Sequence, residues 1–153
     1  MKSYLYLFLS IVLFTSCIDS ENEVIQPEPQ TEVDILKYIE DNNLDATKTE
    51  SGLYYVINSQ GEGTQPTSGS DVTVSYKGTF LNGVTFDKST EAGIEFNLSQ
   101  VISGWTEGIQ LFKEGGEGLL IVPYNLGYGI NNNRGIPGGS VLVFDINLIS
   151  VNN

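Results

Sequence analysis

The side chains that usually carry covalent chemistry are scarce in this sequence. Its 153 residues include no His and one Cys, Cys17. The chain therefore cannot assemble a Ser-His-Asp or Cys-His nucleophile, a zinc site of the usual ligands, or a disulfide. With 19 acidic residues against 7 basic ones, the net charge is -12, which leaves no basic surface for phosphate backbones. Any catalysis must use means other than these, and we expect no nucleic-acid partner.

One group of acidic side chains is spaced like metal ligands. Asp41, Asn43 and Asp45 resemble the start of a calcium loop. However, Ala46 stands at the position that needs Gly, and Gly52 at the position that needs Glu. We therefore expect neither a bound metal nor a cofactor.

The strongest signal is a set of aromatic side chains within short motifs. An aromatic residue at strand spacing is usually part of the core, and each of these alone would be interpreted that way. Only their joint order and spacing suggest a site. The motifs are VSYKG with Tyr76, GVTFDKS with Phe86 and Asp87, VISGWTEG with Trp105, LGYG with Tyr128, the pair Ile136-Pro137, and VLVFDI with Phe144.

The elements that must position these side chains are mainly strands. Residues 72–80 alternate between apolar and polar, which is the period of a half-buried strand, and Asn82-Gly83 predicts a tight turn after them. Trp105 and Ile109 share one side of a helix predicted over 103–113. One short helix among antiparallel strands indicates an α+β fold. The other predicted strands cover 53–59, 94–98, 118–122 and 141–151.

Over residues 51–153 these motifs match one family nearly without gaps. The chain resembles the FKBP-type peptidyl-prolyl cis-trans isomerases, which are macrolide-binding immunophilins. The resemblance implies an FKBP-like antiparallel β-sheet wrapped around one short helix. It also implies isomerisation of X-Pro bonds in proline-containing peptide segments, without a cofactor, and a macrolide as a further ligand.

The resemblance also implies a role for each matching residue. Trp105 would form the floor beneath the proline ring, and Tyr128 would donate its hydroxyl to a substrate carbonyl. Two roles are open for Asp87: facing the carbonyl carbon electrostatically, or holding Tyr76 and the neighbouring loop in place. The implied set comprises the catalytic residues Asp87, Trp105, Tyr128 and Phe144 and the substrate-binding residues Tyr76, Phe86, Ile94, Val101, Ile102 and Ile136.

Two positions depart from the family's pattern. Ile94 occupies a wall position that is aromatic in eukaryotic members, and Gly138 stands where the loop 129–139 often has a second proline. We expect a looser pocket rim at this loop. The departures bear on substrate preference more than on activity.

Amide rotation is a reaction that a protein without nucleophiles can catalyse. Its barrier is about 18–20 kcal/mol because resonance is lost as the C–N bond twists. An apolar pocket favours the twisted amide, which is less polarised than the planar one, and tighter binding of that form is catalysis. Two functions remain open: an isomerase that assists the folding of exported proteins, or a membrane-anchored binding or scaffold module with incidental turnover.

The N-terminus has the pattern of a targeting segment. Lys2 precedes an apolar run from Tyr4 to Phe14, which is too short for a bilayer that needs about 20 helical residues, so residues 1–17 are predicted to be a lipoprotein signal peptide. LFTSC resembles the lipobox of bacterial lipoproteins, which implies lipidation of Cys17. We expect a lipid anchor to a bacterial membrane outside the cytoplasm, on the periplasmic face or the cell surface.

Residues 18–30 are predicted to be an acidic tether, and residues 31–50 a short helix with its connector. The acids of the tether either keep the chain extended or mark it for export to the outer surface. Thr31, with Asp34 three residues later, predicts the helix start. Val33, Leu36 and Ile39 form its apolar stripe, and the helix is expected to end near residues 42 and 43.

This helix is expected to cover an apolar face of the sheet. Alternation divides the side chains of the last two strands between an inner face, towards the helix at 103–113, and an outer face. We predict that the N-terminal helix packs over the outer face; a homodimer, a partner protein or an uncovered face are the alternatives. The expected inner residues are Leu119, Ile121, Phe144, Ile146 and Leu148, and the outer ones are Leu120, Val122, Val141 and Val143.

Overall fold

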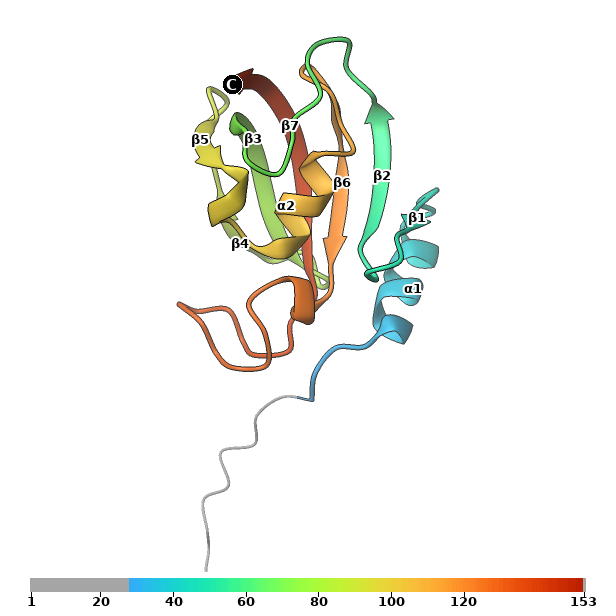
Figure 1. Ribbon diagram of the computed structural model, residues 1–153. Coiled ribbons are helices and arrows are strands. Elements are labelled where there is room, and N and C mark those ends of the chain that lie inside the picture. Colours follow the sequence, from blue (N-terminus) through green and yellow to red (C-terminus); the bar gives the residue numbers. More distant parts are fainter. Residues whose placement is uncertain (1–27, 153) are drawn as a thin grey trace, which may run out of the picture.

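The computed structural model describes residues 28–152, which form a seven-stranded antiparallel β-sheet with one helix packed on each face (Figure 1). The predicted signal peptide, Cys17 and the tether up to residue 27 lie outside the described residues. Between residues 28 and 152, no helix is long and apolar enough to cross a membrane.

The sheet runs in the order β1-β2-β6-β7-β3-β4, and β5 also pairs with β3. Because β5 pairs with the first half of β3 and β4 with its second half, these two short strands share one edge. The elements are α1 (Glu32–Asp41), β1 (Thr47–Lys48), β2 (Tyr54–Ser59), β3 (Asp71–Phe80), β4 (Thr85–Lys88), β5 (Ile94–Asn97), η1 (Leu98–Gln100), α2 (Ser103–Ile109), β6 (Glu117–Val122), η2 (Tyr124–Leu126) and β7 (Leu142–Asn152).

All five predicted strands are present, and two short strands were missed. β4 has only four residues, too few to show a period of two, and its strand conformation depends on pairing with β3. The turn predicted at Asn82-Gly83 is confirmed: the Gly83 amide donates to the carbonyl of Phe80 (2.9 Å), and Gly83 has a φ of 82°. This turn brings β4 back along β3.

Two glycines allow α2 to lie close to the inner face of the sheet. A Cβ on Gly104 would stand 2.5 Å from Val122, and one on Gly108 would stand 2.6 Å from Leu120. The helix is shorter than predicted, and residues 110–113 form a turn in which Phe112 is still fully buried. The apolar pattern therefore continued beyond the helix, because the turn also faces the core.

The predicted orientation of β6 is wrong. Leu120 pairs with Phe144, and Val122 pairs with Leu142; directly opposed residues share a face, so both β6 residues belong to the inner core around α2. Ile121 and Leu119 lie on the outer face instead. The orientation predicted for Phe144, Ile146, Leu148, Val141 and Val143 is confirmed.

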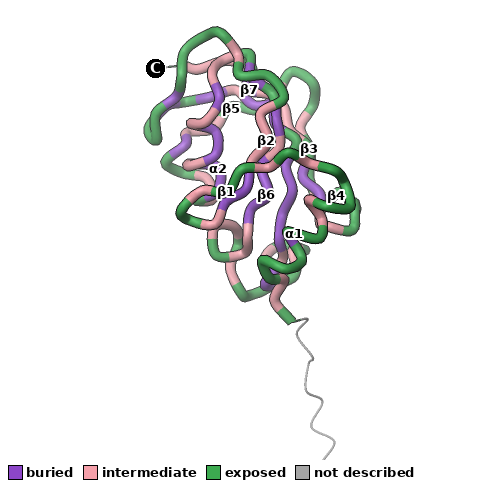
Figure 2. Tube along the Cα trace, turned by 90° about the vertical axis from the view of Figure 1, so that its right-hand side faces the viewer, coloured by how far each residue is buried: buried purple, intermediate pink, exposed green. Residues whose placement is uncertain are grey.

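The predicted packing of the N-terminal helix over the outer face is confirmed. Ile35 of α1 is 2% exposed and packs in one cluster with Ile121, Val141 and Val143. Buried residues therefore run along β6 and β7 between the two helices (Figure 2).

The side of α1 that makes this contact agrees only in part with the prediction. Ile39 of the predicted stripe faces the sheet, together with Ile35 and Tyr38, whereas Val33 is 72% exposed and Leu36 is 49% exposed. Both sets have helical spacing, so periodicity alone could not distinguish them.

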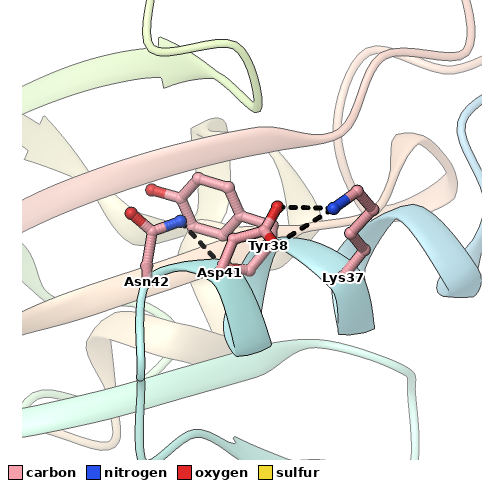
Figure 3. A network of polar contacts seen from close by, with 4 residues as sticks. All are labelled: Lys37, Tyr38, Asp41 and Asn42. Carbon is pink, nitrogen blue, oxygen red and sulfur yellow. Dashed lines mark hydrogen bonds and ion pairs between the residues drawn. The ribbon is translucent and has the colours of Figure 1, made fainter.

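Local contacts define both ends of α1. The predicted Thr31 N-cap is confirmed, because the Thr31 amide donates to the Asp34 carboxylate (2.7 Å) in a capping box. At the other end, the Asn42 side chain donates to the carbonyl of Tyr38 (2.8 Å), and Lys37 forms an exposed ion pair with Asp41 (2.8 Å; Figure 3). A helix of ten residues is only marginally stable by itself, so packing on the sheet contributes more to the stability of α1 than these local contacts do.

Candidate active site

Trp105 is the centre of an aromatic cluster on the inner side of the sheet. It lies in the first turn of α2 and is 4% exposed. Three rings meet the indole edge to face: Tyr76 from β3 (5.0 Å between centroids, 87°), Phe96 from β5 (5.2 Å, 81°) and Phe144 from β7 (5.3 Å, 80°). Edge-to-face pairs are favoured by the ring quadrupoles, so this geometry holds the indole in one orientation.

The indole N–H is buried without a hydrogen-bond acceptor among the described residues. Leaving a buried donor unpaired costs about 1–3 kcal/mol. The surroundings of Trp105 are therefore apolar as well as aromatic, which is the environment that the amide-rotation hypothesis requires.

Phe86 extends the cluster towards the surface, and Gly78 makes the space for it. The Phe86 ring lies 5.6 Å from that of Phe144 at 88°, and 5.1 Å from that of Phe80. A Cβ on Gly78 would stand 2.6 Å from the Phe86 ring and 3.2 Å from Phe144. Gly78 was not among the predicted site residues; a glycine inside a strand pattern is the signal that could have identified it.

Asp87 is bound to Tyr76. The Tyr76 hydroxyl donates to one carboxylate oxygen (2.6 Å), and the Lys88 amide donates to the other (2.9 Å). Burial, and then the hydrogen bond and charge of Asp87, raise the pKa of Tyr76 well above its ordinary value. Tyr76 therefore stays protonated, and the geometry favours the positioning role over the electrostatic one for Asp87.

An open hollow of about 660 Å³ lies beside the aromatic cluster and contains the more exposed predicted residues. Phe86, Asp87, Tyr128 and Ile136 line it. Trp105 does not line the hollow. Phe86 lines it and also contacts Phe144, so Phe86 joins the hollow to the cluster. Tyr128 is 41% exposed, and its hydroxyl has no hydrogen-bond partner within residues 28–152, so it is free to donate to a ligand.

Three other predicted residues do not line this hollow. Val101 and Ile102 are half-buried against the same core. The Ile102 carbonyl accepts from the amides at the start of α2, and no described group accepts from its own amide. Ile94 is 44% exposed at the start of β5. Phe96, two residues further along, makes the contact with Trp105. It was not among the predicted site residues, because the resemblance assigns the wall position to Ile94.

The loop at the rim of the hollow is held by hydrogen bonds. Asn133 and Ile136 exchange backbone hydrogen bonds (2.9 and 2.8 Å), and the Gly138 amide donates to the Asn132 side chain (2.8 Å). A proline at 138 could not make that bond, and any side chain there would collide with the Ile130 carbonyl. These contacts argue against the looser rim that we expected from Gly138.

The described residues offer no cluster of three or more acidic or Cys side chains that could hold a metal ion. The arrangement is a buried aromatic cluster beside an open hollow, in which Phe86 and Ile136 lie among polar and charged side chains and the Tyr128 hydroxyl is free. It can bind an apolar ring and orient a carbonyl.

Comparison with known proteins identifies the family. The model of the FKBP-type peptidyl-prolyl cis-trans isomerase family matches residues 62–149. The chain belongs to this family. The chain is 46% identical over 110 residues to FkpA of Buchnera aphidicola, covering 70% of this chain and 44% of that protein. It is 44% identical over 107 residues to FkpA of Escherichia coli, covering 68% and 40%.

Solved structures of FKBP proteins have the same fold. The crystal structure of E. coli FkpA superposes with a TM-score of 0.73 at 35% identity, covering 79% of this chain and 58% of that one. A peptidyl-prolyl cis-trans isomerase of Pseudomonas syringae superposes with a TM-score of 0.71 at 28% identity, covering 80% and 92%. The predicted α+β FKBP-like fold is confirmed. The chain spans 44% and 40% of the length of the two curated relatives above.

Proposed function

We propose that this protein is a peptidyl-prolyl cis-trans isomerase that assists the folding of exported proteins. The observation that carries the proposal is the edge-to-face enclosure of Trp105, which continues through Phe86 into a hollow edged by the Tyr128 hydroxyl. A proline ring seated against Phe86 would place its amide beside the apolar aromatic cluster, with the preceding carbonyl directed towards Tyr128. There the twisted amide loses less solvation than the planar one, so the barrier falls.

The chain's residues divide the work without covalent chemistry. Trp105 and Phe144 form the buried aromatic base behind the hollow, Phe86 forms the wall that meets it, and Tyr128 orients the carbonyl before the proline. Asp87 acts through Tyr76, whose ring packs edge-on against the indole. Val101, Ile102, Ile94 and Ile136 complete the peptide-binding surface.

The test is acceleration of a proline-limited refolding reaction by the chain from residue 18 onwards. Tyr128→Phe should lower kcat/KM by about two- to tenfold, which corresponds to one neutral hydrogen bond of about 0.5–1.5 kcal/mol. Tyr55→Phe, on β2, removes a hydroxyl away from the hollow and is the matched control. Folded protein that binds proline peptides without accelerating refolding would favour the scaffold alternative. A macrolide that occupies the same surface should inhibit competitively.

We also propose that Cys17 is lipidated and anchors the protein outside the cytoplasm, as a bacterial lipoprotein with residues 1–17 as its signal peptide. The support is the apolar run that ends at this Cys, followed by a polar, acidic tether. Wild-type protein should be found in the membrane fraction, and Cys17→Ala should appear in the soluble fraction. Cys17→Ala protein that stays membrane-bound after a high-salt wash would contradict this anchoring.

A further inference from the structure

One guanidinium group lies at the substrate hollow of an otherwise strongly acidic chain. Arg134 is the only Arg in a sequence whose net charge is -12. It lines the hollow together with Phe86, Asp87 and Tyr128. None of the roles assigned above uses this residue.

The backbone holds Arg134 at the tip of a tight turn. Arg134 has a φ of 45° and Gly135 a φ of 88°. Reciprocal backbone hydrogen bonds between Asn133 and Ile136 close the turn around them. The loop that carries the turn is fixed in addition by the bond from Gly138 to Asn132. The base of the Arg134 side chain is therefore positioned, although the side chain itself is exposed.

The charge of Arg134 is not neutralised by an ion pair within the described part of the chain. The two ion pairs there, Lys37–Asp41 and Lys48–Glu32, both involve α1. Asp87 is the carboxylate that shares the hollow, and its oxygens accept hydrogen bonds from Tyr76 and Lys88, with no ion pair to Arg134. The guanidinium therefore remains free to pair with a group on a bound peptide.

We propose that Arg134 makes this enzyme prefer proline segments with an acidic side chain close to the proline. The proposal rests on the isomerase function and names a substrate class for it. A carboxylate pairs well with the planar guanidinium fork. The acidic overall charge of the protein repels acidic peptides at long range. Arg134 opposes this repulsion locally and would align the acidic side chain so that the neighbouring proline enters the hollow.

The test compares short peptides that differ only in charge beside one X-Pro bond. In each peptide, the residue immediately before or immediately after the X-Pro pair is Glu, Gln or Lys. Isomerisation is followed by NMR exchange, because that measurement needs no coupling protease with its own charge preference. The variants are Arg134→Gln, Arg134→Glu and, as the control, Lys113→Gln. Lys113→Gln removes one positive charge, as Arg134→Gln does. Lys113 follows α2 and does not line the hollow, so this variant separates the effect of net charge from the effect of position.

At low salt, wild-type protein should convert the Glu peptide faster than the Lys peptide by about three- to fivefold at one position or more, as expected for an exposed ion pair. The ratio should fall towards one in Arg134→Gln and in about 0.5 M salt, and it should invert in Arg134→Glu. Lys113→Gln should keep the wild-type ratio. Equal rates for Glu and Lys peptides in the wild type, or a ratio unchanged in Arg134→Gln, overturn the preference while leaving the isomerase function intact. Failure to convert any peptide would remove the function and this inference together.

Discussion

Gly78→Ala is the substitution that most directly tests whether the aromatic geometry produces turnover. The added Cβ would stand 2.6 Å from Cζ and 2.8 Å from Cε2 of Phe86, and 3.2 Å from Cε1 of Phe144. Carbon atoms in contact lie about 3.5–4.0 Å apart. The Phe86 ring must therefore retreat by roughly 1 Å. Because this ring is the wall between the cluster and the hollow, the shape of the hollow changes.

The effect on turnover should be larger than the effect on stability. Overpacking of this kind costs about 1–3 kcal/mol, and replacing a strand glycine by Ala returns about 0.5–1 kcal/mol of backbone entropy. A net loss near 1 kcal/mol lowers Tm by roughly 5 °C. A displacement of about 1 Å in a site can reduce turnover by up to about 100-fold, so we expect a loss of at least tenfold in kcat/KM.

The assay is acceleration of proline-limited refolding, measured beside thermal melting of the same preparations. Gly115→Ala is the control: Gly115 has a φ of +82° and no atom within 4 Å of an added Cβ. Its variant should therefore lose about 1–2 kcal/mol through backbone strain alone. At a temperature where both variants are folded, Gly115→Ala should keep wild-type turnover. If Gly78→Ala keeps it as well, ring placement does not determine turnover and the reasoning is refuted.

Three further outcomes follow from the packing of α1 and from the shifted pKa values. Ile35→Ala should lower the free energy of unfolding by about 2–4 kcal/mol with turnover preserved, whereas Val33→Ala, at a site that is 72% exposed, should change it by less than about 0.5 kcal/mol; equal denaturation midpoints would contradict the observed face of α1. Because burial chiefly raises the pKa of Tyr76 in the folded state, the stabilisation is complete below the unfolded pKa of about 10 and is lost as pH rises towards the folded value. Wild-type protein should then lose more stability above pH 10 than Tyr76→Phe does, and parallel alkaline profiles of the denaturation midpoint would rule this out. The hydrogen bond from Lys48 lowers the pKa of Glu32, so its stabilisation is present above the unfolded pKa of about 4.3 and is lost as pH falls through the folded value. Glu32→Gln should flatten the acid limb of the stability profile, and an acid limb as steep as that of the wild type would show that this pair contributes nothing.

The family and most of the candidate site could be predicted because they depend on local motifs. Trp105 is identified by the preceding VISG, and Phe144 by the surrounding VLVFDI. Such a short motif assigns a residue to one helix or strand without information about distant contacts. The strand period and the Asn82-Gly83 turn are local in the same sense. The Thr31 cap also depends only on residues within one turn of helix.

The residues that were missed depend on close approach between distant segments. Gly78 matters because Phe86 from β4 crosses it, and β4 becomes a strand only by pairing with β3. Phe96 contacts Trp105 because β5 lies along β3 at the edge of the sheet. Arg134 could be assigned a role only because the folded loop places it at the same hollow as Asp87 and Tyr128.

The amino-acid sequence alone determined that the two faces of β6 alternate and that an amphipathic helix precedes the sheet. It could not determine which face meets which helix, because a period of two is unchanged when a strand is turned over. The register that pairs Leu120 with Phe144 made that choice. In α1, two stripes have equal helical spacing, and only the docked position against Val141 and Val143 selected Ile35. Such choices depend on packing between segments far apart in the chain, so they are made in the tertiary structure.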